Sequence, residues 1–439
     1  MFDYYLRLAL RRCRQNLPMV GLLMLTMAIG IASCMTALTI FGALSGDPLP
    51  GISQHLYVAT MDARVAVDKD NSDYKQPGSW LKLADAKALV DAHRARQQLA
   101  LAQSYTEIGN PDGKQSDQVN GFMAYGEPLG MLSVPLRYGR PWTMQELATR
   151  APVVVIDSDL AQKLFGAVDV VGRSVLMGGK PFRVIGVSAP WKPHTVFLDL
   201  SRNQGNPLGG NEQFFVPAEA ALDGGVGPMT TGECGKGAPV IAFQSAEVKQ
   251  CRWMEVWAAL DTPAEVADWR DFVAGYANAQ HDAGRFAYPP QPRLYGSRPW
   301  MTLHRVVPDD VRLNLMLAGA FLLLCMVNVA GLLAARFLRR QADVAIRRAL
   351  GASKRTVFNQ HLVETGVLGL LGGVLALPLT WLGLWIVRQQ PVAYAEAARF
   401  SVGVFAVLLL FSLLVGMVVG ILPAWRICRL PPAMQIKQA

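Results

Sequence analysis

Few residues in this sequence have the types and spacing that enzyme or metal chemistry needs. The six histidines are scattered, and none belongs to an HExxH pattern or lies beside cysteines at the spacing of a metal site. The sequence contains no GxSxG pattern, and the glycine and lysine residues at 109–114 and 178–180 lack the spacing of a P-loop. We therefore predict no catalytic residue, no metal ligand and no ATP-binding loop in this chain.

The most specific pattern is a basic stretch at 336–361. Seven lysine and arginine residues are interspersed there with apolar residues, and Asp343 is the only acidic residue. Gly351 can end a helix, and Ser353 can cap the next one. The stretch is either a helix on the membrane surface or a docking helix at 343–352 that a partner pushes. The residues expected to couple to that partner are Asp343, Ile346, Arg347, Arg348, Ala349, Leu350, Gly351 and Ala352.

Long apolar runs must position this segment. Of the 439 residues, 51% are hydrophobic and only 17% are charged, which excludes an ordinary water-soluble protein. Runs at 18–45, 313–335, 362–387 and 402–424 are long enough, at about 1.5 Å per residue, to cross a hydrocarbon core about 30 Å thick. The first run is longer than the core of a cleaved signal peptide, so we expect an uncleaved anchor. We predict an α-helical membrane protein with four transmembrane helices and a large domain after the first.

The charges outside these runs predict the topology. Residues 1–17, 336–361 and 425–439 together hold 14 basic and two acidic residues, whereas 46–312 hold 26 basic and 29 acidic residues. The positive-inside rule therefore places the first three segments in the cytoplasm, and 46–312 outside it with the short 388–401 loop. Residues 1–17 are expected to form a cytoplasmic or interfacial helix.

Polar residues and glycines within the runs are candidates for helix packing. We expect Asn328 to join helices by hydrogen bonding. Glu364 is expected at a helix N-terminus, where the helix dipole stabilises a carboxylate. Glycines let helices approach closely, and we expect them to pack within the chain. The glycines assigned to this role are Gly372, Gly373, Gly416 and Gly420.

Two of the six cysteines lie in the external domain. The four in cytoplasmic or membrane segments are Cys13, Cys34, Cys325 and Cys428. Only Cys234 and Cys251 therefore lie in a compartment that can oxidise thiols. We expect them to form a structural disulfide that restrains a loop and contributes about 3 kcal/mol in the entropic model. Two separate small core residues are the alternative.

The external domain carries both helix and strand signals and is predicted to be α+β. The expected elements are a helix at 80–99, a strand at 152–156 followed by a helix to 165, a strand–turn–strand unit at 173–187 and a helix at 262–280. Residues 201–238 contain nine glycines, which indicate extended loops around 213–216. The role of this glycine-rich region is left open.

Four segments of the chain resemble FtsX/MacB-like (type VII, mechanotransmission) ABC transporter permeases. The family's cytoplasmic loop and following span are similar to ADVAIRRALGASKRTVFNQHLVETGVLGLLGGVLALPL at 342–379. Its exit from the last span is similar to the tail ILPAWRICRLPPAMQIKQA. The MacB-like periplasmic core is similar to LRYGRPW at 136–142 and to VVVIDSDLAQKLFGAVDVVGRSVLMGGKPFRVIGVSAPW at 153–191. Residues 200–300 have no counterpart in this resemblance, which leaves the substrate open.

The resemblance implies a multi-pass permease of the bacterial inner membrane, with its large domain in the periplasm. It implies a dimer with a second permease, either the same chain or a paralogue. It also implies a separate ABC ATPase that binds ATP and Mg, with no cofactor in this chain. It favours efflux of a hydrophobic or amphipathic compound or peptide through a periplasmic adaptor and an outer-membrane channel. Lol-type lipoprotein extraction and a periplasmic receptor or regulator are the alternatives. The lipid bilayer is expected as a further partner, and no nucleic acid is expected.

Overall fold

The computed structural model describes residues 17–64, 78–200, 211–229, 231, 234, 246–338, 346, 353–392, 394–395, 398 and 402–429. The described residues belong to two compact units. We call the unit within 1–45 and 307–439 the membrane unit, and the unit at 46–306 the inserted unit. The inserted unit follows the first long helix of the chain.

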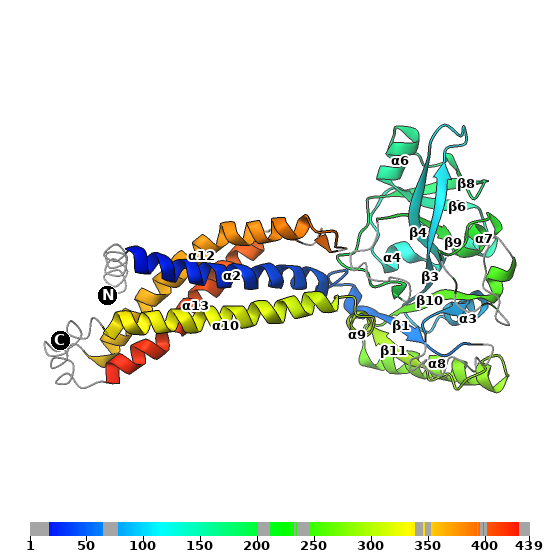
Figure 1. Cartoon of the computed structure of the whole chain (residues 1–439). Helices are drawn as coiled ribbons and strands as arrows, with labels where there is room; N and C mark the ends of the chain where they lie inside the picture. The colour runs from blue at the N-terminus through cyan, green and yellow to red at the C-terminus, as the bar shows by residue number, and fades with distance from the viewer. Residues whose placement is uncertain are drawn as a thin grey trace. The chain divides into compact units, whose positions relative to one another are not determined.

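Four long helices form the described part of the membrane unit (Figure 1). They are α2 (Leu17–Ser45), α10 (Asp309–Leu338), α12 (Lys354–Arg388) and α13 (Val402–Arg429). Among the described residues, α2, α10 and α12 are long and apolar enough to span a membrane. The apolar stretch of α13 is shorter and covers Ala406–Ile421.

Apolar side chains from all four helices meet in one core. Leu23 and Ile31 of α2, Ala376 of α12 and Leu408 of α13 are fully buried there. The helices are apolar on nearly all sides, so many large side chains also face outward, such as Met316 of α10, which is 71% exposed. That distribution is expected of helices whose outer surface meets lipid rather than water.

The inserted unit is built on one mixed sheet. Its strands are β1 (Leu56–Thr60), β2 (Leu81–Lys82), β3 (Gln97–Gly109), β4 (Ser116–Gly126), β5 (Leu136–Gly139), β6 (Val153–Asp157), β7 (Ser174–Met177), β8 (Lys180–Ser188), β9 (Glu212–Pro217), β10 (Arg252–Ala259) and β11 (Arg293–Gly296). The main order is β11-β1-β10-β3-β4-β9-β6-β8-β5, while β2 pairs with β10 and β7 with β3 and β8. The β4–β9 and β6–β8 pairs are parallel, and the other pairs are antiparallel.

Helices of different lengths pack on this sheet and complete the core. They are α3 (Leu83–Asp91), α4 (Pro128–Met131), α5 (Met144–Ala148), α6 (Ser158–Phe165), α7 (Ala218–Asp223), α8 (Pro263–Asp282) and α9 (Ser297–Leu303), with 3-10 turns at Ser53–His55 and Ala246–Gln250. Four tryptophans, Trp253, Trp257, Trp269 and Trp300, are among the largest fully buried side chains. The combination of a mixed sheet and surrounding helices gives this unit an α+β architecture.

Several predicted elements of the inserted unit are confirmed. Strand β6 leads directly into α6, and the side chain of Asp157 accepts a hydrogen bond from the backbone N–H of Leu160 at 2.7 Å. Helix α6 ends at Gly166, whose φ of 67° suits glycine. Thr262 caps α8 by accepting a hydrogen bond from the backbone N–H of Glu265 at 3.2 Å. The predicted strand–turn–strand unit at 173–187 is formed by β7 and β8.

The single helix predicted at 80–99 is wrong at both ends. Helix α3 covers only Leu83–Asp91, with β2 before it and β3 beginning at Gln97. Strand β3 lies between β10 and β4, where its residues 98–102 are buried on both faces of the sheet. A strand that is buried on both faces lacks the alternation of apolar and polar residues that marks a strand in the sequence. The helical spacing of the apolar residues therefore predicted a helix that continues past Asp91 into β3.

The extended loops predicted around 213–216 are also wrong. Those residues belong to β9, which lies in the middle of the sheet between β4 and β6. Phe214, Phe215 and Val216 are buried there, and the chain then enters α7. The surrounding glycines concealed a short apolar strand, because turn signals dominated the sequence pattern on both sides of it.

Candidate functional site

Most residues predicted to couple to an ATPase lie outside the described residues. These are Asp343, Arg347, Arg348, Ala349, Leu350, Gly351 and Ala352. Ile346 is described, is helical, and has 56% of its surface exposed. On the C-terminal side, Ser353 caps α12 by accepting a hydrogen bond from the backbone N–H of Thr356 at 3.1 Å, as predicted. The structure therefore defines the two helices that flank this segment, α10 and α12.

A buried ion pair joins those two flanking helices. Nη2 of Arg336, in the last turn of α10, lies 3.0 Å from Oε1 of Glu364 in α12. The two side chains are only 3% and 2% exposed. Burial removes both charges from solvent, which is costly for each of them. Each charge is therefore stabilised by the opposite charge beside it. The pair links the last turn of α10, before the predicted coupling segment, to the eleventh residue of α12, after it.

Other polar side chains surround this ion pair. His361 lies one turn before Glu364 on α12, with Nδ1 3.8 Å from Oε2 of the carboxylate. Gln360 and Thr365 are buried beside it. Polar groups buried within a membrane bundle are costly and mark positions with a specific role. This cluster is the strongest candidate for a functional site in the membrane unit.

The dipole explanation predicted for Glu364 is wrong. Helix α12 begins at Lys354, so Glu364 is its eleventh residue, about 15 Å from the first at 1.5 Å per residue. The dipole acts within the first turn and cannot explain a carboxylate so far along the helix. Arg336 supplies the compensating charge instead. A sequence signal did exist, because Arg336 and Glu364 carry opposite charges and lie at the facing ends of two consecutive apolar runs.

A hydrogen bond also ties α10 near its other end. The hydroxyl of Tyr394, in the connection between α12 and α13, donates to Oδ2 of Asp310 at 2.6 Å. Burial and the neighbouring Asp310 carboxylate raise the pKa of Tyr394 to about 12. Helix α10 therefore has a polar attachment to the rest of the membrane unit near both of its ends.

Glycines and small residues bring α12 and α13 into close contact. A Cβ atom added at Gly416 would lie 2.7 Å from Cα of Gly369, and one at Gly420 would lie 2.6 Å from Cβ of Thr365. One at Gly373 would lie 2.5 Å from Cβ of Ser412. Any larger residue at these positions would force the helices apart. Three of the four glycines assigned to packing therefore lie so close to the other helix of this pair that a side chain would not fit.

The remaining two residues assigned to helix packing behave differently. Gly372 faces α2, where an added Cβ would lie 3.3 Å from Cβ of Met27. Asn328 is exposed, and its predicted role in packing is not seen among the described residues. The buried stripe of α10 contains Leu322, Cys325 and Val329, and Asn328 lies outside that stripe. The correct packing face depends on the rotation of α10, which a nearly uniform apolar sequence does not reveal.

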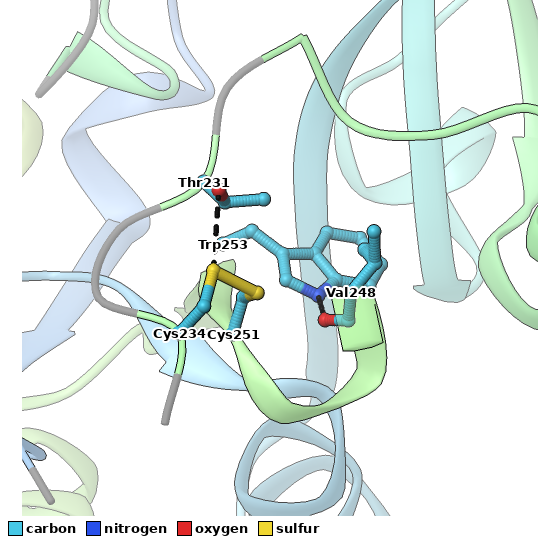
Figure 2. Close-up of a disulfide and its surroundings, with 5 residues drawn as sticks. All are labelled: Thr231, Cys234, Val248, Cys251 and Trp253. Atoms are coloured by element: carbon cyan, nitrogen blue, oxygen red, sulfur yellow. Dashed lines mark hydrogen bonds between the residues drawn. A yellow bond between two sulfur atoms is a disulfide. The ribbon is translucent and has the colours of Figure 1, made fainter. Parts of the chain in front are cut away.

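The two cysteines of the inserted unit are joined by a disulfide (Figure 2). Cys251, which directly precedes β10, is fully buried, and Cys234 is 9% exposed. Nearby, the indole N–H of Trp253 donates to the backbone oxygen of Val248 at 3.0 Å. The bridge ties a residue of the glycine-rich region to the residue that directly precedes β10, an inner strand of the sheet.

Sequence reasoning missed a group of buried carboxyls in the inserted unit. Glu255 of β10 is fully buried and accepts hydrogen bonds from the hydroxyl of Ser79 at 2.6 Å and the backbone N–H of Asp199 at 2.7 Å. The indole N–H of Trp257 donates to the same carboxyl at 3.2 Å. Burial, and then the charge of Asp199, raise the pKa of Glu255 to about 8. Neutral Glu255 is therefore the favoured form at neutral pH.

The group continues across the sheet. Asp199 accepts hydrogen bonds from the indole N–H of Trp80 and the backbone N–H of Gln103, both at 3.0 Å. The side-chain amide of Gln103 donates to Glu212 at 2.9 Å. Burial raises the pKa of Glu212 to about 7. Within the described part of the chain, neither Glu212 nor Glu255 has a basic partner, so these carboxyls are stabilised by hydrogen bonds and protonation.

Sequence models of two protein families match the chain. The MacB-like periplasmic core domain matches residues 20–268, and the FtsX-like permease C-terminal region matches residues 315–432. The chain belongs to the FtsX/MacB-like family of ABC transporter permeases. It is thus a membrane protein whose inserted unit is a MacB-like periplasmic core domain, as the resemblance implied.

Individual relatives agree with this assignment. "Macrolide export ATP-binding/permease protein MacB" of Azoarcus sp. (strain BH72) is 24% identical over 438 residues, covering 98% of this chain and 58% of the relative. The MacB of Hahella chejuensis is 25% identical, with 67% of this chain and 39% of the relative covered. The chain thus spans about two-fifths to three-fifths of these relatives' length. The crystal structure of the periplasmic region of MacB from Actinobacillus actinomycetemcomitans covers 58% of this chain and 94% of its own, with 16% identity and a TM-score of 0.35.

Proposed function

We propose that this permease converts ATP hydrolysis by an ATPase outside this sequence into movement of its periplasmic core domain. ATP and Mg would bind to the ATPase, and the chain itself would carry no cofactor. The movement would expel a hydrophobic or amphipathic compound or peptide through a periplasmic adaptor and an outer-membrane channel. The names of the MacB relatives, which join macrolide export with ATP binding, support this direction.

The proposed topology has four spans in the bacterial inner membrane. Helix α13 is 28 residues long, and its apolar stretch at Ala406–Ile421 lies against α12 through the glycine contacts described above. A fourth span keeps both termini on the same side as the basic 336–361 segment. The large domain and the 388–401 loop then lie in the periplasm.

The buried Arg336–Glu364 pair carries the proposal. It links the last turn of α10, which precedes the segment predicted to dock on the ATPase, to the eleventh residue of α12, which follows that segment. A force applied to residues 343–352 would therefore reach both helices together rather than bend one of them. Apolar residues of similar size could stabilise the bundle as well as the ion pair does. The choice of a charged pair instead supports a role in setting the register of the two helices.

A second permease is proposed to cover the exposed side of α10. Asn328 lies within the apolar run at 313–335, yet its side chain is exposed in a single chain. An amide facing hydrocarbon is unfavourable, and interhelical hydrogen bonding is its usual role in membranes. A dimer with the same or a paralogous chain would give Asn328 a polar partner.

Glu364→Gln tests the coupling role of the ion pair. It keeps the shape of the side chain but removes the negative charge that Glu364 places beside Arg336. We expect the variant to bind the ATPase that co-purifies with the natural chain, while ATP-dependent efflux of a hydrophobic macrolide from cells falls sharply. Arg388→Gln, a change at the other end of α12, is the matched control and should keep efflux. Normal efflux by Glu364→Gln would contradict the proposal.

A further inference from the structure

The segment at 191–200 crosses the inserted unit without joining its sheet, and we call it the strap. Its residues 192–199 belong to no helix or strand. Thr195, Phe197 and Asp199 are nevertheless at most 1% exposed. A buried segment with no ladder of its own depends on its side-chain contacts to stay in place.

Aromatic contacts fix the path of the strap over the sheet. The ring of Trp191 lies edge-on to Phe122 of β4 and Phe215 of β9, with ring centroids 6.5 Å and 5.8 Å apart. The ring of Phe197 lies edge-on to Trp257 of β10 at 5.5 Å. In the sheet, β10, β3, β4 and β9 are consecutive neighbours. The strap therefore runs over four strands, and its later residues lie at β10.

Asp199 is the polar attachment at that end of the strap. Its backbone N–H donates to Glu255 of β10 at 2.7 Å, and its side chain accepts a hydrogen bond from the backbone N–H of Gln103 of β3 at 3.0 Å. Gln103 donates in turn to Glu212 of β9 at 2.9 Å. The three carboxyl groups are only 1%, 0% and 5% exposed for Asp199, Glu255 and Glu212. One carboxyl group of the strap is thus buried with two of the sheet.

The backbone at Asp199 also depends on these contacts. Its φ is 51°, in the left-handed region that residues with a side chain seldom adopt. Such conformations persist where the surrounding contacts hold them. If the hydrogen bonds to Glu255 and Gln103 were lost, the backbone could relax. Residues 197–200 are therefore the part of the strap that is poised to leave the sheet.

The charge on this group depends on pH. Burial, and then the charge of Asp199, raise the pKa of Glu255 to about 8. Burial raises the pKa of Glu212 to about 7, and the charge of Asp199 adds to that effect. The basic and titratable residues of the strap itself, Lys192 and His194, are exposed. As the pH rises, negative charges therefore accumulate in a buried group on both sides of the contact between strap and sheet.

The described residues that surround Glu255 on other elements are uncharged. Its hydrogen-bond donors besides the strap are Ser79, before β2, and Trp257 of β10. Helix α3 lies on the opposite face of the sheet. Gln98 of β3 donates to the backbone of α3, and it is three residues from Leu101, which pairs with Glu255, so the two side chains point to opposite faces.

We propose that the strap is a pH-sensitive latch of the periplasmic core domain. Protonated Glu255 and Glu212 hold its Asp199 end on the sheet, and ionisation of these two groups drives that end away, carrying Asp199 into solvent. Like charges buried together are unfavourable, and hydration of Asp199 relieves the repulsion. Because the closed state binds more protons, opening becomes more favourable as the pH rises. In the topology proposed above, the latch would respond to the pH outside the cytoplasm.

Hydrogen–deuterium exchange of the full chain in nanodiscs, followed by mass spectrometry, tests this proposal. Uptake at residues 197–200 is compared between the natural chain and Glu255→Gln at the same pH, so that the intrinsic exchange chemistry cancels. The closed state retains one extra proton on Glu255 between its ordinary pKa of 4.5 and about 8. The ratio of natural to variant exchange rates should therefore rise about tenfold per pH unit from about pH 6 to about pH 8. A ratio that is constant with pH would overturn the proposal.

Two further variants and a second region make the test specific. Asp199→Asn removes the charge of the strap and keeps a residue that tolerates positive φ, so it should also flatten the rise. Glu107→Gln removes an exposed carboxyl group from β3 and should keep the full rise. Peptides from α6 should show no such ratio. An equal rise in α6 would mean that Glu255 governs unfolding of the whole unit, and would overturn the latch. The test needs no ATPase, so its outcome is independent of the proposed coupling.

Discussion

Glu364 of the membrane unit and Glu255 of the inserted unit are both buried carboxyl groups, but they are stabilised in opposite ways. In the membrane unit, Glu364 stays beside a guanidinium group contributed by another helix. In the inserted unit, Glu255 is fully buried among hydroxyl, indole and backbone donors, and its pKa is raised to about 8. The first arrangement depends on two elements keeping their register, whereas the second depends on the carboxyl holding a proton.

Breaking the ion pair should have the largest effect on stability. Arg336→Ala leaves Glu364 buried without its charge partner, and we expect a loss of about 3–5 kcal/mol in the free energy of unfolding. The double variant Arg336→Met/Glu364→Leu replaces both charges by apolar groups and should recover most of that loss. Thermal unfolding in detergent measures both, with exposed Arg388→Ala as the control. Equal destabilisation by the single and double variants would contradict an interaction between the two residues.

Removing the disulfide should have the next largest effect. Cys234→Ser/Cys251→Ser removes the covalent closure of the loop, so the unfolded chain gains conformational entropy. We expect the free energy of unfolding to fall by about 3 kcal/mol. Buried Trp253 lies beside the bridge, so its fluorescence reports the unfolding of the inserted unit. A reductant should lower the stability of the natural chain and leave the double variant unchanged. If the reductant destabilised both proteins equally, the bridge would not be the source of the effect.

Replacing Glu255 should change the pH dependence of the inserted unit. The pKa of this carboxyl is near 4.5 in ordinary surroundings and about 8 in the fold. The fold favours the protonated form of Glu255. The contribution of this group to the free energy of unfolding is therefore fully present below about pH 4.5 and is lost as the pH rises through about 8. Glu255→Gln should therefore flatten the decline in stability across this interval. Exposed Glu107→Gln is the control, and an unchanged slope in Glu255→Gln would show that other groups cause the decline.

Asn328→Leu should have the smallest effect. It removes an exposed amide from α10, so the stability of a single chain should hardly change. Association of two permeases should weaken by about 0.6 kcal/mol, the average for an interhelical hydrogen bond in a membrane protein. Energy transfer between labelled chains in nanodiscs measures the association. Stronger association of the leucine variant would place Asn328 against lipid rather than against a second permease.

Local patterns in the sequence predicted the features that depend on neighbouring residues. The apolar runs, the Asp157 and Thr262 caps and the hairpin at 173–187 all follow from spacing and turn chemistry. The choice of Cys234 and Cys251 followed from their compartment. These signals remain readable because they do not depend on how distant segments meet.

The features that depend on distant contacts were missed. Glu364 was assigned to a helix end because the sequence does not show which face of α12 meets Arg336. Asn328 was assigned to packing, although the rotation of α10 turns it outward. The buried group around Glu255 unites β3, β9, β10 and residues 79–80 and 199, which are far apart in the chain. Local periodicity carries no information about such assemblies.

The central claim is that residues 343–352 transmit force from the ATPase to α10 and α12. Leu350→Asp tests it most directly, because an unpaired charge buried in that interface costs several kcal/mol and each 1.4 kcal/mol is about a tenfold change in affinity. The measurement is the amount of co-purifying ATPase retained on the immobilised variant, together with ATP-dependent efflux. We predict that retention falls by about tenfold or more and that efflux is lost, while the disulfide-bonded periplasmic domain stays folded. Undiminished retention together with normal efflux would show that this segment is not the coupling element.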